Sequence, residues 1–216
     1  MRLVQKSKPE PEALLTYRKT AGKDAYWDGF PEKEALRDRL LQDQGGLCCY
    51  CMRRIKQSNM KVEHYLSRSL HPEHALSWSN LLAACTGNEG QLKSLQTCDT
   101  AKGNADLQID PRKTEHVDSL RYFSDGRIEA QEFAGDLNET LNLNCPRLVQ
   151  LRAYALDGFR EVMQKKLGRE GAWPQSKLEK ELEQLATEAP LREFCAMFEW
   201  WLKKKLGLIY TKPAAS

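Results

Sequence analysis

The chain has 216 residues, of which 29% are charged and 41% hydrophobic, the balance of a soluble globular protein rather than a disordered one. Its net charge of +3 permits a nucleic-acid partner but is too small to argue for one, since nucleic-acid-binding domains usually carry a larger basic excess. The first residues lack the apolar core of a signal peptide, and no apolar run approaches the ~20 residues that span a bilayer. We therefore expect a cytoplasmic protein that buries one main core.

The first of three regions, residues 1–46, is predicted to be helical. One helix is expected to follow Pro9, because proline is tolerated in the first turn of a helix, and a second helix is expected after Pro31. Leucines recur at helical spacing in the second segment, and Gly45-Gly46 is a typical end for it.

The second region, residues 47–135, is irregular and rich in glycine, asparagine and serine. Within it, Asp125-Gly126 lies between the short runs 120–123 and 127–129, a pattern that predicts a β-hairpin.

The third region, residues 136–216, returns to helical periodicity, with apolar side chains every three or four positions. The first such series is Leu148, Leu151, Ala155, Phe159 and Val162. A last helix is predicted from Leu191 to Leu206. The three regions together predict a mostly helical α+β protein that forms one compact unit.

Four of the seven cysteines have the spacing of metal ligands rather than that of a disulfide framework. Cys48 and Cys51 form a C-x-x-C knuckle, so one turn can present both thiolates to a tetrahedral Zn²⁺ at ~2.3 Å. Cys85 and Cys98 would complete the site, although a polar, glycine-containing insertion separates them, which we interpret as a loop whose closure costs little. We therefore expect a closed, structural zinc site; the alternative is four unrelated buried cysteines.

The other three cysteines fit this site less well. Cys49 could replace Cys48, but a C-x-C pair is a poorer chelating knuckle than C-x-x-C. Cys145 and Cys195 lie in segments that look helical, where we expect them to be small buried residues.

The four cysteines form a frame in the sequence, and residues suited to phosphodiester hydrolysis lie between them or directly after the last one. This reaction requires a deprotonated water and stabilisation of the developing charge. His64 is the natural general base, because histidine can accept a proton at neutral pH. Glu63 and Asp99 are hard oxygen ligands suited to Mg²⁺ or Mn²⁺. In a regular strand Glu63 would point away from His64, so a turn or bulge would be needed to bring both to one metal.

Three further residues are candidates for the same site. Asn80 is expected to hold the loop that carries His64 through its side-chain amide, and Arg68 and Lys102 to bind phosphate oxygens. Each has a simpler explanation when taken alone: Asn80 could be the N-cap of a following helix, and Lys102 could be a solvated surface residue. The order in which all these residues occur within one cysteine frame is what favours a site.

Six stretches of the chain carry a resemblance to a known family. They are Leu47-Cys48-Cys49-Tyr50-Cys51, Val62-Glu63-His64-Tyr65, Asn80-Leu81-Leu82-Ala83-Ala84-Cys85, Cys98-Asp99-Thr100-Ala101-Lys102-Gly103, Ile109-Asp110-Pro111-Arg112 and Leu141-Asn142-Leu143-Asn144. Over about residues 10–205 the chain resembles the PtuB family of HNH (ββα-metal) endonucleases, which belong to Septu and retron-associated antiphage defence systems.

The resemblance implies a ββα-metal core embedded in helices, with a zinc site beside it. His64 would be the general base, and Asn80 the middle residue of the motif. Glu63 and Asp99 would lie near the catalytic divalent ion. The partner would be an ABC-type ATPase, PtuA, joined in the retron version by a reverse transcriptase and its DNA–RNA product. Ser67 departs from the pattern, because a proline commonly stands three residues after the catalytic histidine.

The predicted function is therefore that of a metal-dependent endonuclease, with DNA favoured as substrate, which acts as the effector of an antiphage system under control of the ATPase. Two alternatives stay open. One is a ribonuclease that acts on transfer RNA in a retron-associated system. The other is a non-catalytic, zinc-stapled binding or interaction subunit, which exposure of Trp200 and Trp201 would support.

Overall fold

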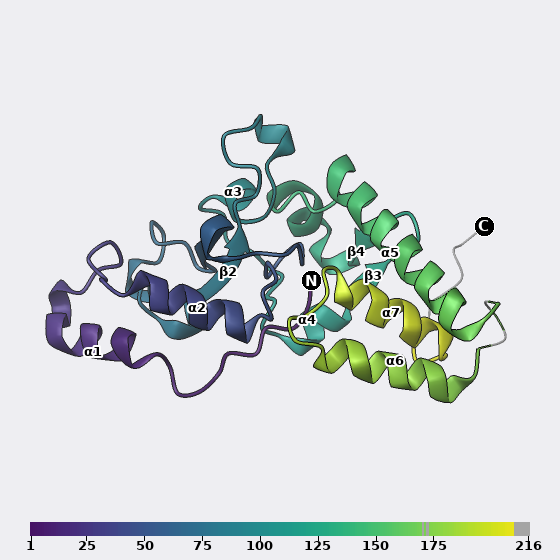
Figure 1. Ribbon diagram of the computed structural model, residues 1–216. Coiled ribbons are helices and arrows are strands. Elements are labelled where there is room, and N and C mark those ends of the chain that lie inside the picture. The colour runs from purple at the N-terminus through teal and green to yellow at the C-terminus, as the bar shows by residue number, and fades with distance from the viewer. Residues whose placement is uncertain (170, 172, 210–216) are drawn as a thin grey trace.

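The computed structural model describes residues 1–169, 171 and 173–209, and its fold is mixed α/β with about half of the chain in helices. The helices are α1 (Glu12–Ala21), α2 (Lys33–Asp43), α3 (Cys98–Lys102), α4 (Thr114–Asp118), α5 (Pro146–Leu167), α6 (Gln175–Thr187) and α7 (Cys195–Lys205). The strands are β1 (Met60–His64), β2 (Leu81–Cys85), β3 (Arg121–Tyr122) and β4 (Ile128–Glu129). The molecule is elongated, with α1 and α2 toward one end and α5, α6 and α7 toward the other (Figure 1).

The two helices predicted in the N-terminal region are present as α1 and α2. On α2, Leu36 and Leu40 are buried, as their spacing indicated. The chain leaves α2 through Gly45 and Gly46, whose φ angles of 59° and 71° lie in the left-handed region that glycine adopts without steric strain.

Strands β1 and β2 form an antiparallel pair in which Met60 lies opposite Cys85 and His64 opposite Leu81. All five residues of β2 are buried, because α2 and α3 both pack against this strand. Burial on every side explains its uninterrupted run of apolar residues. The alternative in which Asn80 caps a helix is therefore wrong, because the residues that follow it form a strand.

The predicted hairpin is confirmed as β3 and β4, with Arg121 opposite Glu129. Its turn passes through Gly126, which has a φ of 89°. A Cβ atom added to Gly126 would lie 2.0 Å from the carbonyl oxygen of Val149, so glycine also allows the turn to approach α5 closely.

The helix predicted from the apolar series that begins at Leu148 is confirmed as α5, but its buried face differs from the expected one. Val162 is 55% exposed, whereas Arg152 is 1% exposed. The Arg152 guanidinium donates hydrogen bonds to the carbonyl oxygens of Gly126 and Leu143 at 2.6 and 2.7 Å. A buried arginine that satisfies backbone carbonyls therefore occupies a core position that hydrophobic periodicity could not indicate.

The aromatic residues of α7 pack mainly against the other C-terminal helices. Phe198 stacks on Phe159 of α5 with ring centroids 4.6 Å apart, and Trp201 packs edge-on against Phe159 at 6.0 Å. Trp201 is buried, and Trp200 is half-buried next to Tyr122. This packing removes the support that two exposed tryptophans would have given to a partner-binding surface. Among the described residues, none of the helices combines the length and apolar character needed to cross a membrane.

Candidate active site

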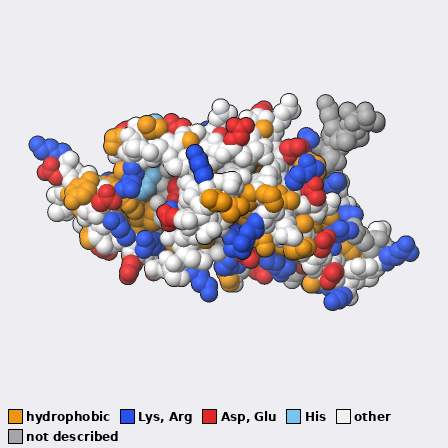
Figure 2. Space-filling view, turned by 90° about the horizontal axis from the view of Figure 1, so that it is seen from above, with side chains coloured by type: hydrophobic (Ala, Val, Ile, Leu, Met, Phe, Trp, Pro, Cys, Tyr) orange, Lys and Arg blue, Asp and Glu red, His pale blue; other side chains and the backbone are white. Residues whose placement is uncertain are grey.

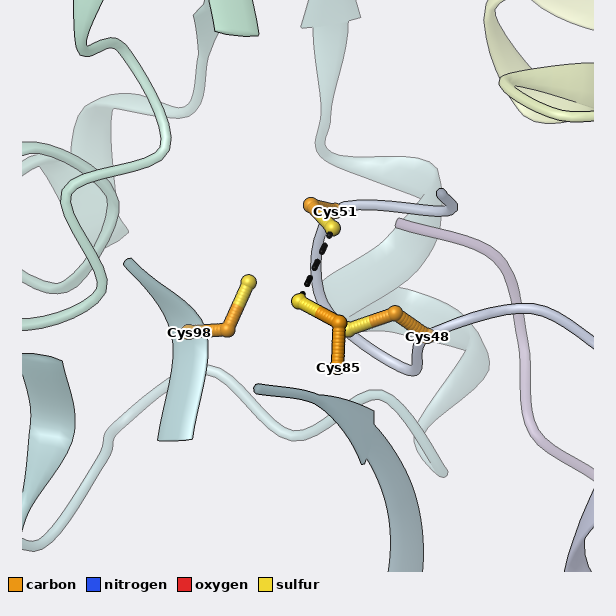
Figure 3. Close-up of side chains that lie close together, drawn as sticks. All are labelled: Cys48, Cys51, Cys85 and Cys98. Atoms are coloured by element: carbon orange, nitrogen blue, oxygen red, sulfur yellow. Dashed lines mark hydrogen bonds between the residues drawn. The ribbon is translucent and has the colours of Figure 1, made fainter. Parts of the chain in front are cut away.

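Four buried cysteines converge beside β2. The sulfur atoms of Cys48, Cys51, Cys85 and Cys98 all lie within 4.8 Å of one another and point toward a common centre (Figure 3). The Sγ atoms of Cys51 and Cys85 are 3.8 Å apart. Tetrahedral Zn²⁺ with Zn–S bonds of ~2.3 Å places its sulfur ligands about 3.8 Å from one another. The cluster could therefore hold a metal ion such as zinc, and it consists of the four cysteines predicted from the sequence.

The cluster connects three parts of the fold. Cys48 and Cys51 lie in the turn that follows α2, Cys85 ends β2, and Cys98 begins α3. Cys49 is buried outside the cluster, and its backbone N–H donates to the carbonyl oxygen of Ala83 in β2. The structure therefore supports Cys48, rather than Cys49, as the metal ligand that pairs with Cys51.

The insertion between Cys85 and Cys98 leaves the cluster and returns to it through a narrow neck. Thr97 N–H donates to the carbonyl oxygen of Gly87 at 2.9 Å. Gly87 has a φ of 55°, and a Cβ atom there would lie 2.0 Å from the Thr97 carbonyl oxygen. Only glycine allows this close approach. The two ends of the loop therefore stay together, and Cys85 and Cys98 remain close in space although the loop separates them in the sequence.

A cleft of about 880 Å³ opens beside β1 and α3. Its lining includes Glu63, His64, Asp99 and Arg68, so four of the predicted site residues border one space. The turn or bulge expected between Glu63 and His64 is absent, because β1 pairs with β2 residue by residue through both positions. The opposite wall comes from the N-terminal region, including Trp27. Figure 2 shows histidine, basic and acidic side chains close together toward the end of the molecule that carries α1.

Glu63 lies at the buried end of this cleft, where it is 1% exposed. Its Oε1 accepts hydrogen bonds from the Tyr50 hydroxyl at 2.7 Å and from the Lys102 ammonium at 2.8 Å. Burial and the neighbouring Asp99 carboxylate raise the pKa of Glu63 to about 8, although the Lys102 ammonium opposes this shift. Two carboxyl groups brought together in a poorly solvated place are the ligand type that Mg²⁺ and Mn²⁺ prefer.

His64 is held by contacts on both sides of its ring. Its Nε2 lies 3.0 Å from the carbonyl oxygen of Ala75. Because a carbonyl can only accept, Nε2–H donates and Nδ1 carries the lone pair. The Trp27 ring packs at right angles to the imidazole at 4.6 Å. Burial and the positive charge of Arg68 lower the pKa of His64 to about 4. The imidazole is therefore neutral at pH 7 and able to accept a proton at Nδ1.

Asn80 holds the loop after His64 in the way expected from the sequence. Its Oδ1 accepts from the backbone N–H of Leu66 at 2.8 Å, and its Nδ2 donates to the carbonyl oxygens of Leu66 and His74 at 3.0 and 3.1 Å. These bonds hold the two ends of the segment from Leu66 to His74 together. Ala75, whose carbonyl oxygen accepts the hydrogen bond from His64, follows this segment directly. Asn80 is not among the residues that line the cleft, so its position is that of a positioning residue.

The two predicted phosphate-binding residues occupy different environments. Arg68 lines the cleft and pairs with Asp28 at 2.9 Å, with its side chain 45% exposed. Lys102 is buried and outside the cleft lining, and its Nζ donates to the backbone carbonyl oxygen of His64 at 2.9 Å as well as to Glu63. The expectation that Lys102 binds phosphate is therefore corrected. Its buried ammonium contacts Glu63 and the His64 backbone and does not border the cleft.

Several residues at the site were not predicted, among them Tyr50, Lys61 and Trp27. Tyr50 lies in the C-x-x-C knuckle, so its proximity to the metal ligands was a usable signal. Lys61 lies 3.7 Å from Asp99, two positions before Glu63 on the same strand. Trp27 had no signal in the sequence, because its contact with His64 depends on how the N-terminal region folds back over β1.

No protein-family model matches the chain. Among curated proteins, it is similar to the "Retron Ec83 putative HNH endonuclease" of Escherichia coli, with 31% identity over 113 residues, 44% of this chain and 43% of that protein. It is 30% identical over 104 residues to the "Retron Vc95 putative HNH endonuclease" of Vibrio cholerae serotype O1 biovar El Tor, covering 47% of this chain and 49% of that one.

A third relative comes from the other type of system. The "Septu protein PtuB" of Bacillus thuringiensis is 27% identical over 110 residues, 50% of this chain and 37% of that protein. The resemblance to HNH endonucleases of the retron and PtuB types is thus confirmed over about half of this chain. The chain spans less than half the length of each of these relatives.

Proposed function

We propose that this chain is a metal-dependent endonuclease of the HNH type, which hydrolyses phosphodiester bonds in nucleic acid. The observation that carries the proposal is the convergence of Glu63, His64 and Asp99 on one cleft. Two of these residues end an antiparallel strand pair, and the third lies on the short helix packed against that pair. This strand–strand–helix order supports a ββα-metal core.

The side chains divide the chemistry between them. His64 takes a proton from water at Nδ1, since its Nε2–H is occupied by Ala75. Arg68 binds a non-bridging phosphate oxygen at the exposed edge of the cleft. Glu63 and Asp99 would hold a divalent ion, Mg²⁺ or Mn²⁺. When bound, that ion supplies positive charge to stabilise the pentavalent transition state and the departing oxygen.

The candidate zinc site serves this arrangement by fixing the helix that carries Asp99. Cys98 is the first residue of α3, and Asp99 follows it directly. A zinc ion bound by Cys98 and the other three cysteines would therefore hold Asp99 against the strand pair. This is a structural role, consistent with four protein ligands and no open coordination position.

We further propose that the nuclease is the effector of an antiphage defence system, that it works in the cytoplasm and that an ABC-type ATPase of the PtuA kind controls it. The similarity to a Septu PtuB protein supports this proposal. The two retron-associated relatives make a reverse transcriptase and its DNA–RNA product the alternative partners. DNA is the favoured substrate, and transfer RNA is the alternative.

The test is cleavage of plasmid DNA and of bulk transfer RNA by the full chain, with and without a co-expressed neighbouring ATPase. Reactions contain Mg²⁺ or Mn²⁺, or a chelator, and compare the parent with His64→Ala. Loss of a general base is expected to slow cleavage ~10²–10⁴-fold. His74→Ala is the matched control, because this histidine is exposed and lies outside the cleft lining.

Metal-dependent cutting that disappears in His64→Ala and persists in His74→Ala would support the proposal and identify the polymer. Cutting that survives in His64→Ala would remove this histidine from the mechanism. A zinc-loaded protein that cuts neither polymer, even with the ATPase, would favour the non-catalytic binding subunit.

A further inference from the structure

Two cationic residues of the cleft wall have no acidic partner among the residues that the structure describes. Lys33 and Arg37 occupy positions i and i+4 of α2, which places them side by side on one face, and both line the cleft. Lys33 Nζ donates to the backbone carbonyl oxygen of Asp28. Arg37 makes no ion pair with any described residue, and its buried Nε has no hydrogen-bond partner among them. Like charges at this spacing destabilise a helix, which indicates that the pair serves another purpose.

The remaining charges of the cleft are already paired or assigned. Arg68, which pairs with Asp28, is already assigned to the phosphate at which cleavage occurs, and Lys61 pairs with Glu89 at 2.8 Å. The other two acidic residues of the lining are the proposed ligands of the divalent ion. Lys33 and Arg37 are therefore the cations of this wall that are available to an incoming anion.

Trp27 stands on the same wall. It is half-buried, lines the cleft and lies 4.6 Å from the His64 ring. Within the described part of the chain its indole N–H has no hydrogen-bond partner. The indole N–H groups of Trp78 and Trp173, in contrast, donate to backbone carbonyl oxygens. The Trp27 ring also packs against Phe30 with centroids 6.2 Å apart, and the Lys33 ammonium lies 5.6 Å from the Trp27 ring centroid. An aromatic ring that lines the cleft next to the proposed base, with a cation beside it, is suited to contact with a nucleotide, the ring with its base and the cation with its phosphate.

We propose that this wall binds single-stranded nucleic acid, with Lys33 and Arg37 contacting backbone phosphates and Trp27 stacking on an unpaired base. The inference rests on the proposed nuclease function and specifies its substrate class. A base that stacks on Trp27 belongs to a nucleotide next to the phosphate at His64. In a duplex the faces of that base are covered by its neighbours, so this contact requires an unpaired strand.

The test measures binding by the full chain without added divalent ion, so that cleavage does not interfere. Fluorescently labelled oligonucleotides of about 12 nucleotides, DNA and RNA, are compared with a DNA duplex of the same sequence. The parent is expected to bind single strands more tightly than duplex. Trp27→Ala is expected to weaken single-strand binding by about 5- to 150-fold, the loss associated with one stacked base. Trp27→Phe should restore much of it.

The phosphate contacts proposed for Lys33 and Arg37 are tested by the salt dependence of single-strand affinity. Arg37→Gln should reduce the slope of log affinity against log salt concentration by about 0.7, the value for one phosphate contact on a single strand. Lys165→Gln is the matched control, because Lys165 is an exposed cation of α5 outside the cleft lining. Tyr26→Ala is the matched control for Trp27→Ala, since this neighbouring tyrosine is 63% exposed and also lies outside the cleft lining. Circular dichroism and zinc content verify that each variant is folded.

Equal affinity of the parent for single strands and duplex would overturn the proposal. So would unchanged single-strand affinity in folded Trp27→Ala. These outcomes are separable from failure of the nuclease proposal, because a chain that binds single strands through Trp27 but cuts nothing would retain this inference and lose the other. The DNA and RNA arms identify which strand is preferred.

Discussion

The hydroxyl group of Tyr50 donates a 2.7 Å hydrogen bond to the Glu63 carboxylate, and Tyr50 itself lies between Cys48 and Cys51. The knuckle that contributes two ligands to the candidate zinc site therefore also orients a carboxylate of the cleft. Because Tyr50 is fully buried, this bond is not weakened by competition with solvent. The two metal sites proposed for the chain are thus coupled through one side chain.

Tyr50→Phe is expected to weaken binding of the catalytic divalent ion, because Glu63 loses one of the two donors that fix its orientation and keeps only Lys102. Substitutions of this kind commonly cost ~10–100-fold in metal affinity. The measurement is the Mn²⁺ concentration that gives half-maximal cleavage. Tyr65→Phe is the control, since it removes a buried hydroxyl that donates to the backbone of Leu107 instead. An unchanged Mn²⁺ requirement in Tyr50→Phe would contradict the coupling.

Asn80→Ala is expected to lower the free energy of unfolding, because it leaves the Leu66 N–H and two carbonyl groups without their partner. An unsatisfied buried donor alone costs about 1–3 kcal/mol. Urea denaturation gives the value. Asn104→Ala, at an exposed asparagine whose side chain has no hydrogen-bond partner among the described residues, should change stability far less. Equal effects of the two substitutions would remove the special role assigned to Asn80.

Cys98→Ser is expected to abolish stoichiometric zinc binding and to lower the thermal midpoint, because one of four ligands is lost. Zinc content by atomic absorption and a thermal melt measure the two effects. Cys145→Ala, at a buried cysteine outside the cluster, should keep its zinc. A chelator should lower the midpoint of the parent but not that of Cys98→Ser. Full zinc occupancy in Cys98→Ser would refute the ligand assignment.

Gly87→Ala is expected to destabilise the protein by more than the ~1–2 kcal/mol that a left-handed backbone alone costs a residue with a Cβ atom. The additional loss comes from the 2.0 Å approach to the Thr97 carbonyl oxygen. Gly90→Ala isolates the conformational part, because Gly90 has a φ of 80° but no atom within 4 Å of the added Cβ. Chemical denaturation of both variants compares them, and equal losses would show that the neck is not tight.

The sequence predicted those features that depend on local chemistry. The C-x-x-C knuckle identified Cys48 and Cys51, and Asp125-Gly126 identified the hairpin, because ligand spacing and turn geometry are both set within a few residues. The order of Glu63 and His64 within the cysteine frame was sufficient to select two residues of the cleft.

Features that depend on distant contacts could not be predicted in this way. Hydrophobic periodicity assigned a core position to Val162 on α5, whereas Val162 is exposed and Arg152 is buried on that helix together with its apolar residues. The carbonyl partners of Arg152 lie elsewhere in the chain. Lys102 was predicted to bind phosphate oxygens, and its burial against Glu63 could not be predicted because that carboxylate lies on another element. Trp27 escaped notice because only folding brings it to His64.

The neck between Gly87 and Thr97 also defines a place where the chain tolerates foreign sequence. Beyond the neck, the loop carries Leu92, which is 75% exposed, and the ends of the loop are joined by their own hydrogen bond. Additional residues at its tip change the closure entropy only slowly with length. A fluorescent tag or epitope inserted at Leu92 would label the protein while the cysteine cluster kept its geometry, and Glu89, which lines the cleft and pairs with Lys61, should be left in place.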